Sequence, residues 1–400
     1  MPPTLAELRA HPNALSPHYS RFRVAERLLL TGHSHQAWPD RAFAGQQRAW
    51  QDAAELVDAK WERAFAEAER VRDGYRRLLD DPSGKYSLAA NTFELLVRLL
   101  SALPLKQRPK LVSTDAEFYS LRRLLARLEE EGIEVVRVSS RPAADVGLRL
   151  AGATDDHTAA VLTSSVFFDT AHIAGELPAA ARACRECGAI LVLDAYHQLN
   201  VVPLSLVQAG LEDVYVVGAG YKYCQLGEGN GFLRFPADCT LRPIATGWFA
   251  EFSELTRKQE TGPVHYQTGD DRFAGATYDP TSHYRGAEVF RFFADLELDV
   301  DLLRTVSQHQ IGLLGRLFDD LDLDTGVISR DRGTPLHAVG GFLSLRSPEA
   351  ASIWQALASE GVYTDQRGDV LRLGPAPYLS DRQLEEAMTR LGRIVRQLDA

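Results

Sequence analysis

Residues 189–197 read Ala-Ile-Leu-Val-Leu-Asp-Ala-Tyr-His, and residues 214–223 read Val-Tyr-Val-Val-Gly-Ala-Gly-Tyr-Lys-Tyr. Each stretch begins with a short apolar run, which is typical of a strand covered on both faces of a parallel sheet. Ligands of such sheets bind at the carboxyl ends of the strands. Asp194 and Lys222 follow these two runs and are therefore candidates for one site.

Outward from these stretches, strand patterns alternate with helical ones. We predict strands at 86–89, 110–114, 133–138, 159–163, 189–193, 214–217 and 231–235. Helices are expected at 42–79, 93–103, 120–131 and 177–187. This alternation predicts an α/β fold with a mostly parallel, seven-stranded sheet.

The pattern changes after about residue 285. A mainly helical stretch, 285–319, precedes strands at 339–345 and 370–373 and helices at 349–360 and 381–398. A chain of 400 residues is too long for one core, because single cores stop growing near about 250–300 residues. We expect an N-terminal segment at 1–45, a large domain at 46–285 that includes a connecting segment, and a small α+β domain at 286–400.

Composition narrows the class of protein. The net charge is −10 and no basic stripe is present, so nucleic-acid binding is not expected. No signal-peptide pattern and no apolar run long enough to span a membrane is visible, and a cytoplasmic location is expected. Four cysteines in the whole chain do not make a disulfide framework.

Lys222, Asp194 and the pair Asn91-Thr92 together fit pyridoxal phosphate (PLP) chemistry. The cofactor's aldehyde needs an amine, which Lys222 would supply as a Schiff base, and its pyridine nitrogen needs a carboxylate such as Asp194. Its phosphate needs amides and hydroxyls at a helix start, where Asn91 and Thr92 stand. Taken singly, Asp194 and Asn91-Thr92 could be helix caps, and Lys222 an exposed loop lysine.

Five motifs strengthen the combination: Asp-Ala-Tyr-His at 194–197, Gly-Ala-Gly-Tyr-Lys-Tyr at 218–223, Gly-Trp-Phe at 247–249, Gly-Ala-Thr-Tyr-Asp-Pro at 275–280, and Leu-Arg-Leu-Gly-Pro-Ala-Pro-Tyr at 371–378. In this order they resemble the PLP-dependent fold-type I superfamily. Within it the chain is most similar to the kynureninases of the class V aminotransferase group, over nearly its whole length.

The resemblance implies roles for individual residues. Lys222, Asp194 and Tyr221 would be catalytic, and Arg372 would bind the substrate α-carboxylate, a task that suits a guanidinium fork. The implied cofactor contacts are Asn91, Thr92, Phe118, Asp194, His197, Tyr221, Lys222, Trp248 and Thr277. Trp248 and Thr277 would come from the partner subunit of a homodimer whose active sites lie at the interface. The N-terminal segment would pack on the small domain and the active site.

Three places depart from the kynureninase pattern. The N-terminal Gly-Asn-Ser-Leu-Gly reads Gly-His-Ser-His-Gln at 32–36, the second aromatic of Gly-Trp-Trp is Phe249, and Tyr278 replaces an amide residue. His33, Ser34, Phe249 and Tyr278 would therefore shape a substrate pocket. No metal site is expected, because neither His33 with His35 nor Cys184 with Cys187 has an evident further ligand.

The resemblance favours hydrolytic Cβ–Cγ cleavage of an L-amino acid, giving alanine and an aryl acid. A class V aminotransferase or a β-eliminating lyase would share every cofactor residue and remains open as an alternative. A cysteine desulfurase is less favoured because the chain has Asp-x-x-His in place of Asp-x-x-Gln. A non-catalytic binding protein and a nicotinamide-dependent dehydrogenase rank lower, the latter for want of a Gly-x-Gly-x-x-Gly turn.

Overall fold

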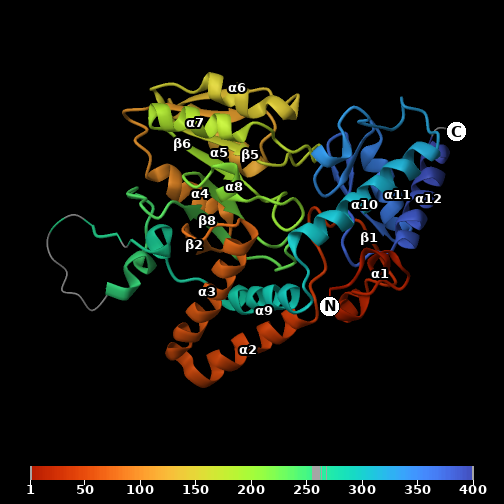
Figure 1. Ribbon diagram of the computed structural model, residues 1–400, viewed down its shortest axis with the longest axis horizontal. Coiled ribbons are helices and arrows are strands. Elements are labelled where there is room, and N and C mark those ends of the chain that lie inside the picture. The colour runs from red at the N-terminus through yellow and green to blue at the C-terminus, as the bar shows by residue number, and fades with distance from the viewer. Residues whose placement is uncertain (1, 255–261, 263, 267, 399–400) are drawn as a thin grey trace.

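The computed structural model describes residues 2–254, 262, 264–266 and 268–398. Residues 255–261, 263 and 267, which belong to the connecting segment at the end of the large domain, therefore lie outside the described residues. A large sheet with its helices occupies one side of the molecule, and the C-terminal elements with a smaller sheet occupy the other (Figure 1). No helix in the described part of the chain is long and apolar enough to cross a membrane.

The large sheet has seven strands in the order β2-β8-β7-β6-β5-β3-β4. Five neighbouring strands run parallel, while β8 is antiparallel to both β2 and β7. Their bounds are β2 Lys85–Ala89, β3 Lys110–Thr114, β4 Glu134–Val138, β5 Thr158–Ser164, β6 Ile190–Asp194, β7 Tyr215–Gly218 and β8 Gly231–Phe235. The predicted α/β fold with a mostly parallel, seven-stranded sheet is confirmed.

Apolar side chains leave both faces of this sheet, because successive strand residues point to opposite sides. Val112 and Leu191 join the core under α6 and α7, whereas their neighbours Leu111 and Val192 join the core under α4 and α5. The helices are α4 Thr92–Ser101, α5 Tyr119–Glu130, α6 Val146–Ala153, α7 Leu177–Cys187 and the short α8 Leu206–Ala209. Helices on both faces explain why β6 and β7 are continuously apolar.

The single helix predicted at 42–79 is wrong, because the chain bends there. It forms α2 Arg41–Leu56 and α3 Lys60–Leu78, joined by a 3-10 turn at Val57–Ala59. Val57 has a φ of 51°, which a continuing right-handed helix does not allow. Both helices pack on α9, and Figure 1 shows them as two arms beside it. The bend lets both apolar stripes reach the same partner.

The stretch predicted as mainly helical, 285–319, contains two helices, α9 Thr281–Asp295 and α10 Val300–Asp320. Asp299 is the N-cap of α10, because its side chain accepts a hydrogen bond from the Leu302 amide. The expected domain boundary at 285/286 falls inside α9, which packs on α2 and α3.

The smaller sheet has the order β12-β13-β10-β9 and is antiparallel. The strand predicted at 339–345 begins only at Leu343, because residues 339–342 lead away from the 3-10 turn at Leu336–Ala338. The bounds of the C-terminal elements are β9 Ser329–Arg330, β10 Leu343–Arg346, α11 Ala350–Ser359, β11 Val362–Tyr363, β12 Asp365–Arg367, β13 Val370–Leu373 and α12 Asp381–Leu398. The 3-10 helices outside the α2–α3 bend are Ser16–Phe22, Ala143–Asp145, Trp248–Glu254, Asp270–Phe273 and Leu336–Ala338.

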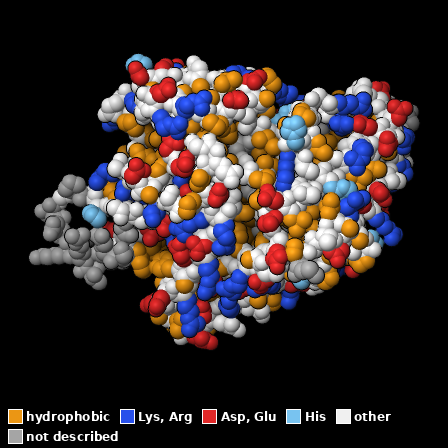
Figure 2. All heavy atoms as spheres, in the orientation of Figure 1, with side chains coloured by type: hydrophobic (Ala, Val, Ile, Leu, Met, Phe, Trp, Pro, Cys, Tyr) orange, Lys and Arg blue, Asp and Glu red, His pale blue; other side chains and the backbone are white. Residues whose placement is uncertain are grey.

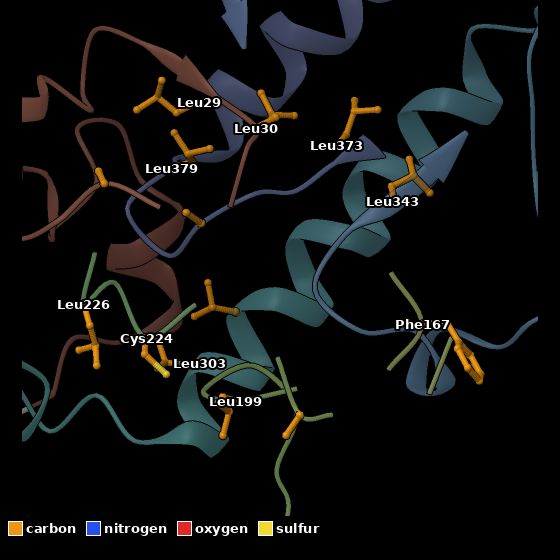
Figure 3. Packing of buried hydrophobic residues seen from close by; sticks show 14 of the residues in the cluster. Leu29, Leu30, Phe167, Leu199, Cys224, Leu226, Leu303, Leu343, Leu373 and Leu379 are labelled. Atoms are coloured by element: carbon orange, nitrogen blue, oxygen red, sulfur yellow. The ribbon is translucent and has the colours of Figure 1, made fainter. Parts of the chain in front are cut away.

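The N-terminal segment lies on these C-terminal elements. Helix α1 (Leu5–Arg9) packs on α10, and β1 (Leu28–Leu29) pairs in parallel with β11. Figure 3 shows Leu29 and Leu30 close to Leu379 and Leu373 within the main hydrophobic cluster. On the surface, positive and negative side chains are interspersed across the face drawn in Figure 2.

Candidate active site

The carboxyl edge of the large sheet brings Asp194 and Lys222 together. Asp194 ends β6 and pairs in register with Val217 of the parallel neighbour β7. β7 ends at Gly218, and Lys222 follows it; the Nζ of Lys222 lies 2.6 Å from Nε2 of His197, which follows Asp194 in the Asp-Ala-Tyr-His motif. The positive charge of Lys222 lowers the pKa of Asp194, and the negative charge of Asp194 raises the pKa of Lys222.

Lys222 is enclosed by aromatic and imidazole rings. Only 6% of the residue is exposed. Its Nζ lies 2.6 Å from Nε2 of His197. It also lies 4.8 Å from the ring centre of Tyr196, 5.7 Å from that of Phe118 and 5.8 Å from that of Tyr221. The amine therefore points into the protein and not into solvent.

Burial controls the charges of this cluster. Desolvation lowers the pKa of Lys222 from an ordinary value of 10.5 to about 7, against the opposing pull of the Asp194 carboxylate. Desolvation and the positive charge of Lys222 lower the pKa of His197 well below its usual range. Burial raises the pKa of Asp194, and the Tyr196 amide, which donates to Asp194 at 2.9 Å, partly offsets that rise. A neutral amine beside a neutral imidazole is available near pH 7.

The start of α4 closes one side of the site. Asn91 caps this helix by accepting from the Glu94 amide at 3.0 Å, so its carbonyl oxygen already has a partner. Thr92 is the first helical residue, and its side chain interacts with Tyr196, which also interacts with Tyr221. Unpaired amides and the helix dipole make such a start an anion-binding element.

Glu117 lies on the other side of the site, next to Phe118, and the sequence analysis did not predict a role for it. Its carboxyl accepts from the Thr114 hydroxyl at 2.6 Å and from the Ser164 hydroxyl and amide at 2.7 and 3.0 Å. These bonds join the ends of β3 and β5 and set the position of the adjacent Phe118. Burial raises the pKa of Glu117 to about 7, and the Asp194 charge adds to the rise.

Arg372 reaches the site from β13. Its Nη2 donates to Oδ1 of Asp365 at 2.8 Å, and its Nη1 donates to the Phe168 carbonyl at 2.7 Å. Asp365 stands directly opposite Arg372 in the β12–β13 register. The Arg372 Nε has no hydrogen-bond partner. The guanidinium is thus held in place, and its Nε–H and the second N–H of each Nη remain for a ligand.

Phe342 lies between the part of the site around Lys222 and the part around Arg372. Its fully buried ring lies 4.8 Å from the ring of His33 and 5.7 Å from that of His197. The Arg372 guanidinium carbon lies 5.7 Å from its centre. Phe342 also lines a groove of about 730 Å³ between the two parts of the molecule.

The remaining N-terminal candidates make local contacts. The Ser34 hydroxyl donates to the Thr31 carbonyl at 3.0 Å. His35 stacks on Tyr221 with ring centres 4.9 Å apart, and its Nε2 lies 3.3 Å from Glu228. In the described ranges, no group of three His, Cys, Asp or Glu side chains could hold a metal ion.

Four predicted site residues lie in a different place. Trp248 Nε1 donates to the Thr277 hydroxyl at 3.2 Å, and Tyr278 shares a 2.6 Å hydrogen bond with His283. Phe249 and Tyr278 pack with an aromatic group made of Trp61, Phe65 and Phe252. Trp61 and Phe65 belong to α3, whereas Phe249 and Phe252 belong to the 3-10 helix Trp248–Glu254. Within one chain the structure does not bring these residues to Lys222.

The residues at Lys222 fit an aldehyde cofactor with an anionic group. A buried amine, a carboxyl beside it and a helix start supply the three required contacts. Nδ1 of His197 and Nε of Arg372 are buried without partners. Buried polar atoms are normally paired, so these atoms indicate that a ligand completes the site.

Sequence comparison shows that the chain is similar to kynureninases. A family model described as the kynureninase C-terminal domain matches residues 329–391, which include Asp365 and Arg372. Curated kynureninases from Burkholderia pseudomallei (strain 1106a) and Burkholderia mallei (strain SAVP1) are each 26% identical over 389 residues, covering 91% of this chain and 88% of theirs. The chain is kynureninase-like.

Solved structures similar to this kynureninase-like chain show its fold. A mutant of C-DES with glycine covalently linked to its PLP cofactor superposes with a TM-score of 0.80 at 15% identity, covering 94% of this chain and 98% of that one. The Escherichia coli cysteine desulfurase CsdA gives a TM-score of 0.76 at 14% identity, covering 98% and 99%. The predicted PLP fold-type I architecture is confirmed.

Sequence reasoning missed four residues around Lys222 and Arg372: Tyr196, Glu117, Phe342 and Asp365. Tyr196 stands inside the Asp-Ala-Tyr-His motif and Glu117 directly precedes Phe118, so their position was a usable signal. Phe342 and Asp365 carry no such signal, because only the fold of the small sheet brings them to Arg372.

Proposed function

We propose that this chain is a PLP-dependent enzyme acting on an L-amino acid. The observation that carries the proposal is the buried amine of Lys222, whose pKa is lowered to about 7, near the Asp194 carboxyl at the edge of the sheet. When bound, PLP supplies an electron sink for the bonds at the substrate's Cα. Lys222 would bind its aldehyde, Asp194 would hold the ring nitrogen protonated, and Phe118 would cover the ring.

The chain's own residues divide the remaining tasks. Asn91, Thr92 and Tyr221 would bind the phosphate at the start of α4. Lys222 Nζ, with a pKa of about 7, can take a proton from the substrate's Cα as general base. His197 Nε2 lies 2.6 Å from it and can orient the amine.

The reaction branch proposed is kynureninase-like hydrolysis of a Cβ–Cγ bond. It is supported by 26% identity over nine tenths of the chain and by the C-terminal family match. A β-eliminating lyase is the second candidate, because a structure named as the cystine C–S lyase C-DES with cysteine persulfide has a TM-score of 0.79. Desulfuration is less favoured, since three of the four cysteines are buried and Cys187 is half-buried.

We further propose that a second copy of the chain completes each site, with Trp248 and Thr277 crossing to the partner. The exposed Thr277 and the 40% exposure of Trp248 support this. Sedimentation would show a dimer, and Trp248→Ala would weaken PLP binding. A monomer with full PLP affinity would contradict the proposal.

The test begins with the cofactor. Purified protein with PLP should show a visible absorption band that borohydride removes, and Lys222→Ala should lack it, with Lys110→Ala as the matched control. Incubation with L-kynurenine alone should release anthranilate and alanine. Pyruvate from L-cystine would favour the lyase, and turnover only with an added keto acid the aminotransferase. Absence of the band in the wild type would refute the proposal.

A further inference from the structure

His33 is buried without any hydrogen-bond partner. None of the residue is exposed, and both ring nitrogens lack partners. Burial and the nearby positive charges of Arg372 and Lys222 lower its pKa well below the usual range, so the ring is neutral. A neutral imidazole has one N–H donor and one acceptor. Leaving both unpaired inside a protein is costly, which indicates that something else binds there.

The backbone around His33 is fixed by the end of β13. Gly32 donates to the Gly374 carbonyl at 2.7 Å, and Gly374 donates to the Leu30 carbonyl at 2.8 Å. A Cβ on Gly374 would lie 2.2 Å from Nδ1 of His33, so only glycine leaves room for the ring. Both nitrogens lack partners, and because Nδ1 lies against Gly374, Nε2 is the candidate donor to a ligand.

His33 and Arg372 are placed to act together. Gly374, against which His33 packs, follows Arg372 by two residues, and residues at that spacing face the same side of an extended chain. Both side chains contact the ring of Phe342. Arg372 offers only part of its fork, because one N–H of Nη1 donates to the Phe168 carbonyl and one N–H of Nη2 donates to Asp365.

We propose that His33 is the second donor for the α-carboxylate of the amino-acid substrate, acting beside the free Nε of Arg372. The inference rests on the proposed function and names how that site recognises its substrate. His33 Nε2–H donates to one carboxylate oxygen and Arg372 Nε–H to the other. Asp365 is a positioning residue, which holds the guanidinium in place and reduces its net charge.

The experiment measures binding, using the absorption band of the PLP-loaded protein. L-Alanine and L-alaninamide are titrated into wild type, His33→Leu, His33→Asn and the control His157→Leu, a change at an exposed histidine of the loop before β5. His33→Leu should weaken L-alanine about tenfold, the loss of one hydrogen bond to a charged group, and L-alaninamide by less than about twofold. His33→Asn, which keeps a donor, should recover part of the affinity.

A second variant separates the carboxylate contact from packing. Asp365→Asn removes the competing charge from Arg372 and should tighten L-alanine but not L-alaninamide. Equal weakening of both ligands by His33→Leu, or no weakening, would show that His33 only packs on Phe342 and would overturn the inference. If the wild type forms no PLP band, the proposed function itself fails, which is a distinct result.

Discussion

The ionisation of Lys222 gives the sharpest prediction. Burial lowers its pKa from 10.5 to about 7. An amine reacts with an aldehyde only when it is neutral, and one pKa unit is a factor of ten in the ratio of the two forms. At pH 7 about half of Lys222 is neutral, against roughly one part in 3,000 for an ordinary lysine. The rate at which apoprotein takes up PLP should therefore rise with a midpoint near pH 7.

Two substitutions should move that midpoint in opposite directions. The Asp194 carboxylate raises the pKa of Lys222 and the Arg372 guanidinium lowers it. Asp194→Asn should shift the midpoint down and Arg372→Gln should shift it up, each by about one unit. Asp194→Asn keeps an oxygen for the Tyr196 amide, so the local fold has reason to persist.

Stopped-flow absorbance measures the uptake between about pH 5 and pH 10, with Nα-acetyl-lysine in the same buffers as the reference for a solvated amine. Circular dichroism at each pH checks that the apoprotein stays folded. A wild-type midpoint near that of the free lysine would refute the burial argument. Shifts of the same sign in both variants would refute the assignment of the neighbouring charges.

Two further predictions concern stability. Asp81→Asn breaks the fully buried ion pair with Arg234, in which Arg234 Nε and Asp81 Oδ2 lie 2.7 Å apart. Because the Arg234 charge is then buried without its partner, the free energy of unfolding measured in urea should fall by about 3–5 kcal/mol. A loss below about 1 kcal/mol would contradict this. Burial raises the pKa of Glu117 to about 7 in the folded protein, whereas it is about 4.3 in the unfolded chain. The folded state therefore favours the protonated carboxyl, and this contribution to stability is complete below about pH 4.3 and is lost as the pH rises through about 7. The unfolding free energy of wild type relative to Glu117→Gln should therefore fall by roughly 3–4 kcal/mol between about pH 4 and pH 7, and a pH-independent difference would show that the carboxyl is solvated.

The sequence alone determined the large sheet and the position of the candidate site at its edge. Apolar runs ending in Asp194 and in the glycine turn before Lys222 are local signals, and a parallel sheet brings successive strand ends to one edge. The same signals placed Thr92 at a helix start and Phe118 after a strand. Periodicity could not show the bend at Val57, because both sides of the bend carry the same apolar spacing.

Only the tertiary structure decided what surrounds Arg372 and His33. Asp365 meets Arg372 through the register of two short strands, and His33 comes near Arg372 because the N-terminal segment is hydrogen-bonded to Gly374 at the end of β13. His33 and Arg372 stand more than 300 positions apart in the sequence, and both contact the ring of Phe342. Hydrogen bonding between distant backbones sets these contacts, and no local pattern of side chains records which strand a segment will join.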